Sequence, residues 1–451
     1  MGSNTSELTY SRVLPVISEP DVLVCGVGCA GLAAAVSAAR MGAKTMAIEQ
    51  FGFAGGFMTA QMSTAGDGLF DMTNGELVVG GIALEILDKL HVIKLPLDSN
   101  KLFEPLVEQE VIDRYPSKIP FRVGSIERLK LVADRLLAES GAQVLYHTKV
   151  VDVVTTRGRV DYVIVGNKDG ISAIKPKVVI DCTGDADVTA WAGAPYEVSP
   201  IHQPGSLHFT VGNIKNAKTL EDLYSLTIRC AKVLQDGHKS GIIKSFGGPW
   251  IAPNGPNEVL FNAVKLDFDS TSAEETSRAE IRGREDAWAM FSIWKKQLAE
   301  FSDAYFAASA PTVGARESRI ITGEYTLTRD DIAHSRTFPD SIAKGSWYLD
   351  RHSSDEIGFH EHVTVEAYDI PYRTLLPKNT ENLLVAGRCH SATPEALASS
   401  RVNFTAMAMG QAAGVAATLS AKNATYPSDL NMTRLQEHLL RQGQIFGTGV
   451  N

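Results

Sequence analysis

A glycine-rich turn near the N-terminus constrains the fold more than any other feature of the chain. Residues 21–50 read DVLVCGVGCAGLAAAVSAARMGAKTMAIEQ. An apolar run enters the pattern Gly26-x-Gly28-x-x-Gly31, an alanine-rich stretch follows, and a second apolar run leads to Glu49. This order predicts a strand, a helix and a second parallel strand, the unit on which dinucleotides bind.

Each part of this motif has a physical role in binding a dinucleotide. The glycines permit a tight turn, a close approach of the backbone to a pyrophosphate, and close packing of helix on strand. The helix N-terminus offers its N–H groups to the phosphates. Glu49 follows the motif by about 20 residues, where an acid takes the ribose hydroxyls. Since an acid disfavours a 2′-phosphate, we expect FAD or NAD rather than NADP.

Composition narrows the class of protein and of partner. A chain of 451 residues is long for one core, so two or three domains are expected. The net charge of -9 and the lack of a dense Lys/Arg block argue against nucleic acid and anionic membranes, which leaves a small-molecule substrate. No apolar run reaches about 18 residues and no secretory signal is evident, so a cytoplasmic protein without membrane insertion is expected. A homo-oligomer stays open.

Further glycine turns favour FAD over NAD. A second glycine-rich loop, with Gly55 and Gly56, follows Glu49 directly, where an NAD dehydrogenase usually carries only the next crossover. Two later apolar runs, residues 178–181 and 383–386, also end in glycine turns that lead into helices. Strand-then-glycine turns far apart in sequence are what a long dinucleotide spread over one sheet requires.

Several of these segments together resemble the FAD-dependent oxidoreductase family. They are GVGCAG at residues 26–31, Glu49, the Gly55-Gly56 loop, and residues 178–197, 314–332, 368–388 and 383–414. This family is part of the flavoprotein group with the glutathione-reductase type of FAD fold, which also holds fumarate reductases and tRNA-uridine-modifying flavoproteins. The likeness covers most of the chain and is weakest over residues 214–310.

The resemblance implies an α/β fold: a glutathione-reductase-type, Rossmann-like FAD-binding domain with an inserted α+β substrate domain. We expect residues 1–200 to begin the FAD domain, residues 201–375 to form the substrate domain, and residues 376–451 to return to the FAD domain. The last helix is expected from about residue 404, with its N-terminus facing the flavin pyrimidine. The cofactor residues expected beyond the first two loops are Gly184, Asp185, Gly387, Arg388, Arg401, Asn403 and Phe404. The family commonly has a proline at or near position 404.

Catalytic candidates lie in two polar segments. His352 is a candidate acid or base, Tyr372 a proton donor and Arg373 a carboxylate clamp, although Tyr372 and Arg373 could instead brace the two domains. His390 stands where the family leads us to expect an apolar residue, which suggests a substrate contact or covalent flavin attachment. Its neighbour Cys389 is expected to pack.

Other polar residues are weaker candidates for a functional role. His360 and His362 lack a third ligand at recognisable spacing, so no metal is expected. Arg316 and Arg319 are expected chiefly to form interdomain ion pairs.

These observations predict an FAD-dependent oxidoreductase of the oxidase or dehydrogenase type. It would transfer a hydride between an organic small molecule and flavin N5, oxidising CH–OH or CH–NH or reducing C=C. The electron donor or acceptor stays open. One alternative is an FAD monooxygenase that uses NAD(P)H and oxygen. Another is a non-enzymatic or tRNA-modifying relative, which the acidic net charge disfavours. No CxxxxC pair follows the first motif, which sets disulfide reduction aside.

Overall fold

A five-stranded parallel sheet carries the first glycine turn. The computed structural model describes residues 8–90, 121–122, 125–199, 203–217, 220–255, 258–353 and 361–447. The strand order is β21-β10-β2-β3-β6, and every neighbouring pair is parallel. The strands are β2 (Val22–Cys25), β3 (Thr45–Ile48), β6 (Gln143–Leu145), β10 (Val178–Asp181) and β21 (Leu383–Val385). Four of them are wholly buried, as expected for parallel strands covered on both faces.

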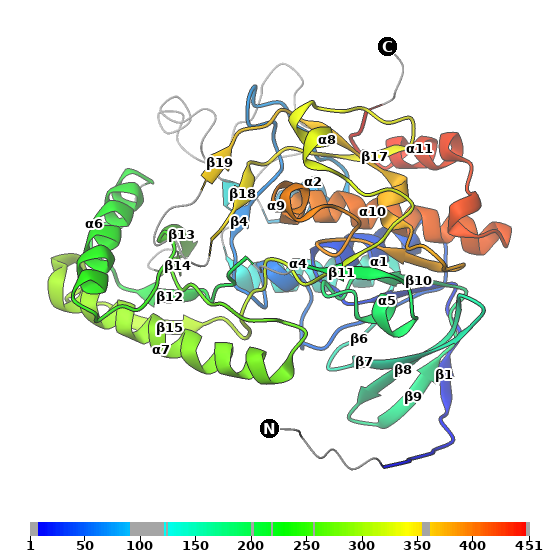
Figure 1. Ribbon diagram of the computed structural model, residues 1–451, viewed down its shortest axis with the longest axis horizontal. Helices are drawn as coiled ribbons and strands as arrows, with labels where there is room; N and C mark the ends of the chain where they lie inside the picture. Colours follow the sequence, from blue (N-terminus) through cyan, green and yellow to red (C-terminus); the bar gives the residue numbers. More distant parts are fainter. Residues whose placement is uncertain are drawn as a thin grey trace.

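Helices cover one face of this sheet (Figure 1). Val22 and Val24 join a core with these helices, and Leu23 and Cys25 point to the other face. The helices are α1 (Cys29–Arg40), α2 (Ile82–Lys89), α4 (Ile126–Ser140), α10 (Asn403–Asn423) and α11 (Met432–Arg441). A β-carbon at Gly410 of α10 would overlap the carbonyl oxygen of Ala30 in α1. Glycine therefore sets how closely these two helices approach.

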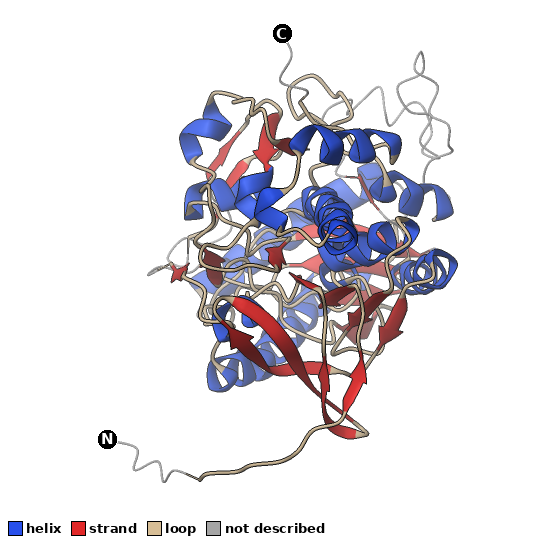
Figure 2. Ribbon diagram, turned by 90° about the vertical axis from the view of Figure 1, so that its right-hand side faces the viewer, coloured by secondary structure: helices blue, strands red, loops and turns tan. Residues whose placement is uncertain are grey.

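An antiparallel ribbon covers the opposite face and lies nearest the viewer in the lower part of Figure 2. It consists of β7 (Lys149–Thr156), β8 (Arg159–Asn167) and β9 (Gly170–Ile174), and β1 (Val16–Ser18) adds to β9 in parallel. Arg157 and Gly158 join β7 to β8 with positive φ of 51° and 83°. The two strands pair antiparallel on either side of this turn.

A second lobe is built on an antiparallel sheet of order β13-β14-β12-β15, at the left of Figure 1. Its elements are β12 (Phe209–Gly212), β13 (Trp250–Gly255), β14 (Glu258–Asn262), β15 (Tyr305–Ser309), α6 (Leu220–Lys239) and α7 (Ala273–Gln297). Phe261 packs 4.9 Å from Trp294 and 5.5 Å from Phe209 between ring centroids. The lobe therefore has its own aromatic core.

The remaining elements are short. The strand pairs are β4 (Ala65–Gly66) with β5 (Phe121–Arg122), β11 (Tyr196–Val198) with β16 (Arg319–Ile321), β17 (Ser341–Gly345) with β20 (Tyr368–Pro371), and β18 (Leu349–Arg351) with β19 (Glu361–Val363). The short helices are α5 (Asp187–Trp191), α8 (Arg329–Ala333), α9 (Pro394–Ser400), and the 3-10 turns η1 (Gly56–Met58), η2 (Ala299–Phe301), η3 (Tyr372–Leu375) and η4 (Pro427–Asp429).

The core of the second lobe runs from Leu207 to Val313, with Met62 and Ile126 added from the first lobe. Ile342 and Ile370, of β17 and β20, pack in the main core instead. The domain boundaries at residues 200 and 375 stay predictions, and this packing favours a return to the main lobe before residue 375.

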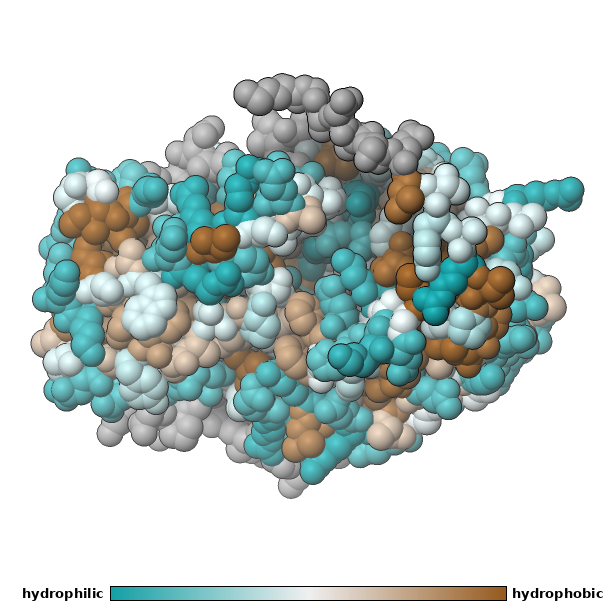
Figure 3. Space-filling model, turned by 90° about the horizontal axis from the view of Figure 1, so that it is seen from below, coloured by the Kyte–Doolittle hydropathy of each residue, from teal (hydrophilic) through white to brown (hydrophobic). Residues whose placement is uncertain are grey.

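The surface seen from below is mostly polar, with hydrophobic residues in separate groups (Figure 3). In the described part of the chain, no helix combines the length and apolar character that crossing a membrane requires.

Candidate active site

The turn after β2 leaves space at the start of α1. Gly26 has φ +88°, and a β-carbon there would lie 2.6 Å from the Cys182 carbonyl oxygen. Gly28 is the N-cap of α1 and supplies no side-chain cap, and the first turn of α1 holds no acidic residue. A β-carbon at Gly28 would meet only the Gly56 Cα, at 3.8 Å. An uncapped helix N-terminus beside open space suits a phosphate.

Glu49 is fixed beside this turn at the end of β3. Its carboxylate accepts the Val27 N–H at 2.7 Å and the Phe51 N–H at 3.0 Å. Burial raises the pKa of Glu49, and these backbone hydrogen bonds partly offset that rise. Each carboxylate oxygen has more than one acceptor position, so both can still accept ribose hydroxyls.

The second glycine loop lies directly on the first. Gly55 and Gly56 have φ of +108° and +49°, and the Gly55 N–H donates to the Val27 carbonyl at 2.8 Å. A β-carbon at Gly56 would lie 2.7 Å from the Gly28 Cα. The structure thus brings Gly26, Gly28 and both loop glycines to one place. Gly31, in the first turn of α1, abuts the Gly26 carbonyl, where only a glycine fits.

The glycine turns after β10 and β21 are joined by an ion pair. Arg388 Nη2 lies 2.7 Å from Asp185 Oδ1, and Arg388 Nη1 donates to Ser318 Oγ at 3.0 Å. Burial opposes ionisation of Asp185, but Arg388 and nearby hydroxyls bring its pKa below the usual value. Gly184 and Gly387, at φ +84° and +103°, make both turns possible. The pair therefore ties the two strand ends together, and contact of these residues with the cofactor stays a prediction.

The start of α10 holds the loop at residues 65–68. Asn403 Oδ1 accepts the Asp67 N–H at 2.9 Å, and Asn403 Nδ2 donates to the Ala65 carbonyl at 2.9 Å. The Phe404 N–H donates to the Asp67 carbonyl at 3.2 Å. A proline at position 404 could not make that bond. The N-cap Val402 gives no side-chain cap, so the Asp67 carbonyl, which accepts the Phe404 N–H, takes only part of the capping role at the start of α10.

His352 lies in a polar cluster at the base of the β18 hairpin. Its Nε2 is 3.1 Å from Asp350 Oδ2, and its backbone N–H donates to Gln203 Oε1 at 3.2 Å. Burial and the charge of Arg316 lower the pKa of His352 to about 2, although Asp350 opposes the shift. At neutral pH the ring is therefore uncharged.

The other three catalytic candidates lie elsewhere. His390 is fully buried, with Nε2 2.8 Å from Ser400 Oγ, and burial lowers its pKa to about 4. The Tyr372 hydroxyl donates to the Pro427 carbonyl at 2.9 Å, and Arg373 pairs with Asp340 at 2.9 Å. These contacts favour the bracing interpretation for Tyr372 and Arg373. His360 lies outside the described residues, as does the side chain of His362.

The structure also identifies polar residues near His352 that the sequence analysis missed or misread. His208, just before β12, is 5% exposed, and its ring faces that of Phe57 at 6.2 Å between centroids. Gln203 binds both oxygens of Glu317, at 2.8 and 3.1 Å. No motif marks these positions; a histidine beside the apolar run FTVG was the available signal.

Of the two arginines expected to form interdomain ion pairs, one does so. Arg319 pairs with Asp187 at 2.7 Å. Arg316 instead donates to the Pro204 carbonyl and forms no ion pair with any residue that the structure describes. The prediction fails at Arg316 because the neighbouring Glu317 carboxylate is already held by Gln203.

A sequence model of the FAD dependent oxidoreductase family matches residues 21–439, from the strand before the first glycine turn into α11. The chain belongs to this family. Its cofactor is FAD, and the uncapped start of α1, the open space at Gly28 and the buried Glu49 carboxylate suit that cofactor. As a family member it is an FAD-dependent oxidoreductase, and the mixed α/β fold with a parallel sheet agrees with this.

Solved structures resemble this family member only distantly. A geranylgeranyl bacteriochlorophyll reductase-like protein from Thermoplasma acidophilum is 14% identical, with 95% of this chain and 84% of that chain covered and a TM-score of 0.45. The flavin-dependent brominase Bmp2 is 12% identical, with 94% of this chain and 83% of that chain covered and a TM-score of 0.45. The p-nitrophenol 4-monooxygenase from Pseudomonas putida is 11% identical, with 94% of this chain and 84% of that chain covered and a TM-score of 0.44. Likeness at this level carries no argument about activity. No curated protein matches the chain by sequence.

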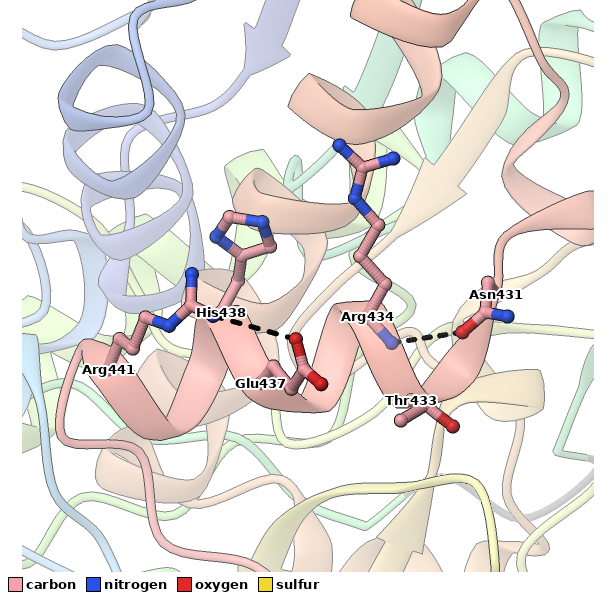
Figure 4. A pocket seen from close by; sticks show the side chains of 6 residues that line it. All are labelled: Asn431, Thr433, Arg434, Glu437, His438 and Arg441. Atoms are coloured by element: carbon pink, nitrogen blue, oxygen red, sulfur yellow. Dashed lines mark hydrogen bonds and ion pairs between the residues drawn. The ribbon is translucent and has the colours of Figure 1, made fainter.

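A polar surface pocket lies along α11, away from the glycine turns (Figure 4). Its lining comes from one segment: Asn431, Thr433, Arg434, Glu437, His438 and Arg441. Within the helix, Asn431 Oδ1 accepts the Arg434 N–H at 3.0 Å, and Arg441 pairs with Glu437 at 3.5 Å. Among the described residues, no group of three or more His, Cys, Asp or Glu side chains is placed to hold a metal ion.

Proposed function

We propose that this family member transfers a hydride between an organic small molecule and FAD, with His352 exchanging the accompanying proton. The observation that carries the proposal is a buried junction between the glycine loops and the second lobe. A β-carbon on Gly314 would lie 2.5 Å from Gln61 Oε1, and His208 faces Phe57. The loop that contains Gly56, which lies against Gly28, thus contacts the second lobe at Phe57 and Gln61.

The residues proposed to hold FAD lie around the glycine turns. The N-terminus of α1 and Gly28 would bind the pyrophosphate, and Glu49 the ribose hydroxyls. The start of α10 would lie toward the pyrimidine, where its N–H groups favour negative charge. We also infer the glutathione-reductase type of FAD fold, which the parallel sheet with an antiparallel ribbon on one face supports. When bound, FAD supplies the hydride acceptor or donor at N5.

The chain's own residues would handle substrate and proton. His352 is uncharged at neutral pH, and its Nε2 lies against the Asp350 carboxylate. The low pKa makes the ring a weak base by itself, so the Asp350 carboxylate, which opposes that shift, would have to stabilise the ring as it takes a proton from a CH–OH or CH–NH group during oxidation. The Trp250 ring lies 6.0 Å from the His352 ring between centroids, in an edge-to-face arrangement. The second lobe therefore supplies an aromatic side chain beside the proposed base.

Anaerobic reduction of the flavin tests this proposal. Purified holoprotein mixed with a panel of alcohols, amines and hydroxy acids should lose its flavin absorbance without NAD(P)H when a substrate is present. His352→Gln should slow that bleaching at least about 100-fold while the flavin content is retained. Bleaching only by NAD(P)H, followed by oxygen-dependent hydroxylation of the organic compound, would establish the monooxygenase alternative instead.

A further inference from the structure

Five segments far apart in sequence are linked by contacts through residues 203–208. They are the loop at residues 57–62, residues 203–208 before β12, residues 314–317 before β16, residues 350–352 at the end of β18, and Arg401 before α10. Backbone bridges join Ser206 to Gly314 and Gly205 to Leu266. We call this region the junction cluster. It lies between the glycine loops of the main lobe and the sheet of the second lobe (Figure 1).

Two arginines of the junction cluster are largely buried and close to each other. Arg316 Nη1 donates to the Pro204 carbonyl, and Arg401 Nη2 donates to Gln203 Oε1 at 3.2 Å and to the Asp350 carbonyl at 3.3 Å. Burial, together with the charge of Arg401, lowers the pKa of Arg316 to about 9. Arg401 also has a lowered pKa, chiefly because of burial. Since their partners Pro204 and Gln203 are adjacent in sequence, the two cations lie close together.

The carboxylates nearby do not neutralise these arginines directly. Glu317 is turned to Gln203 with both oxygens, and Asp350 Oδ2 faces the His352 ring. Within the described parts of the chain, neither Arg316 nor Arg401 has an ion pair with a carboxylate. Among the residues that the structure describes, the buried Arg401 Nη1 has no hydrogen-bond partner, and neither has His208 Nδ1, which donates or accepts depending on its tautomer. A buried guanidinium donor without a partner is costly, so Arg401 Nη1 calls for a ligand that accepts a hydrogen bond.

We propose that Arg316 and Arg401 anchor the carboxylate of an organic substrate, in a site that His208 and His352 also line. This inference rests on the proposed function, because it names the substrate class of the same site. A guanidinium presents a planar fork that matches a carboxylate. Asp350 and Glu317 already place two negative charges in the cluster. A carboxylate adds one more, whereas a phosphate monoester would add nearly two, so the carboxylate is favoured.

The anchor also places the substrate relative to the base. Arg316 bonds the Pro204 carbonyl, next to Gln203, which accepts the His352 N–H, and the bridge from Gly314 to Ser206 brings its segment beside His208. Its charge accordingly lowers the pKa of both histidines. Arg401 comes from the main lobe, one residue before the N-cap of α10. A carboxylate held by both arginines would bridge the two lobes, and the carbon attached to it would lie beside the neutral His352.

Binding of simple carboxylates to the holoprotein tests the anchor without turnover. Calorimetric titrations would use acetate, succinate and benzoate, with acetamide, succinamide and benzamide as uncharged counterparts, at constant ionic strength. We expect at least one carboxylate to bind about tenfold or more tightly than its amide. Equal binding of acids and amides would overturn the anchor, and so would tighter binding of inorganic phosphate or sulfate than of every carboxylate.

Variants locate the binding at Arg316. In Arg316→Gln the Kd of that carboxylate should rise about 10- to 100-fold, and Arg316→Lys should restore part of the affinity. The control Arg278→Gln, on the exposed face of α7, should bind like the wild type. Wild-type affinity in Arg316→Gln would contradict the anchor. Melting temperature and flavin content show whether each variant is folded. Even if a variant does not fold, the wild-type titration decides whether the protein prefers carboxylates to amides.

The two proposals fail in different ways. If carboxylates bind through Arg316 but no organic compound bleaches the flavin, hydride transfer is wrong and the anchor holds. If an uncharged substrate bleaches the flavin of Arg316→Gln at the wild-type rate, the anchor is wrong and hydride transfer holds.

Discussion

At the scale of single residues, His390 shows how burial changes the meaning of a reactive sequence. Arg388, Cys389 and His390 stand side by side in sequence, yet each has a different environment. Arg388 pairs with Asp185, the Cys389 thiol has a pKa raised by burial, and His390 packs against Ser400. The thiol is therefore protonated at neutral pH, and the imidazole is neutral and enclosed. This geometry gives little support to a covalent flavin link, which stays the untested expectation.

Burial of His390 should make stability depend on pH. Its folded pKa of about 4 is lower than the unfolded value of about 6.5, so the unfolded chain binds more protons between those two values. Stability is therefore lost as pH falls below about 6.5, by up to about 1.4 kcal/mol per pH unit, and the loss levels off below about 4. His390→Gln should reduce the slope of unfolding free energy against pH by that amount.

Urea unfolding at pH 5 and pH 7 measures this slope. His334→Gln, at an exposed position of the same residue type, should leave the slope unchanged. An unchanged slope in His390→Gln as well would show that His390 is not a buried neutral histidine.

At the scale of elements, the positions of strands and helices could be predicted from the sequence, but which of their side chains are exposed could be predicted less well. β2, β10 and β21 form where the sequence has apolar runs. The Ser125 side chain caps α4, as a serine directly before a helical pattern indicates. Two tryptophans of α7 differ sharply: Trp294 is fully buried, and Trp288 is 52% exposed. Trp288 stacks on Phe306 at 4.5 Å, a contact across elements that helical periodicity cannot reveal.

The contact between α1 and α10 depends on glycine in a way that a substitution can test. A β-carbon at Gly410 would overlap the Ala30 carbonyl, and one at Gly414 the Ser37 hydroxyl. Since backbone cannot yield as a side-chain tip can, Gly410→Ala should destabilise the protein by about 1–3 kcal/mol or more. Gly237 of α6 is the matched control, because its β-carbon would meet only side-chain atoms of Ile293 and Ile243.

Chemical denaturation of both variants gives the comparison. We expect Gly237→Ala to cost less than Gly410→Ala by at least about 1 kcal/mol. Equal stability of Gly410→Ala and the wild type would mean that the two helices can separate without loss.

At the scale of the whole molecule, the cofactor region could be predicted and the junction cluster could not. Gly26, Gly28 and Glu49 lie within one local motif, and local spacing carries their meaning. His208, Gln203 and Arg316 act together only because the second lobe folds back on the loop at residues 57–62. Contacts between segments more than a hundred residues apart leave no spacing to read, so only the fold reveals them.

The same arrangement predicts that FAD stabilises both lobes. The loop that borders Gly28 also reaches the second lobe through Gln61 and Phe57, which lie against Gly314 and His208. Ordering of this loop by the cofactor should therefore be transmitted to β12 and β14 as well as to β2. At a free FAD concentration 100 times its Kd, linkage gives about 2.7 kcal/mol of added stability. Hydrogen exchange with and without FAD should show slower exchange in all three strands.

Gly28→Val is the control that separates the effect of FAD binding on hydrogen exchange from the effect of the fold itself. Its branched side chain would fill the open space at the start of α1, while its β-carbon meets only Gly56 at 3.8 Å, so the chain should fold and lose FAD binding. Gly166→Val, on β8, should keep FAD because its β-carbon only touches Val151 at 3.4 Å. In Gly28→Val, added FAD should slow exchange in none of the three strands. Protection confined to β2 in the wild type would show that the lobes respond independently, because the loop would then fail to couple them.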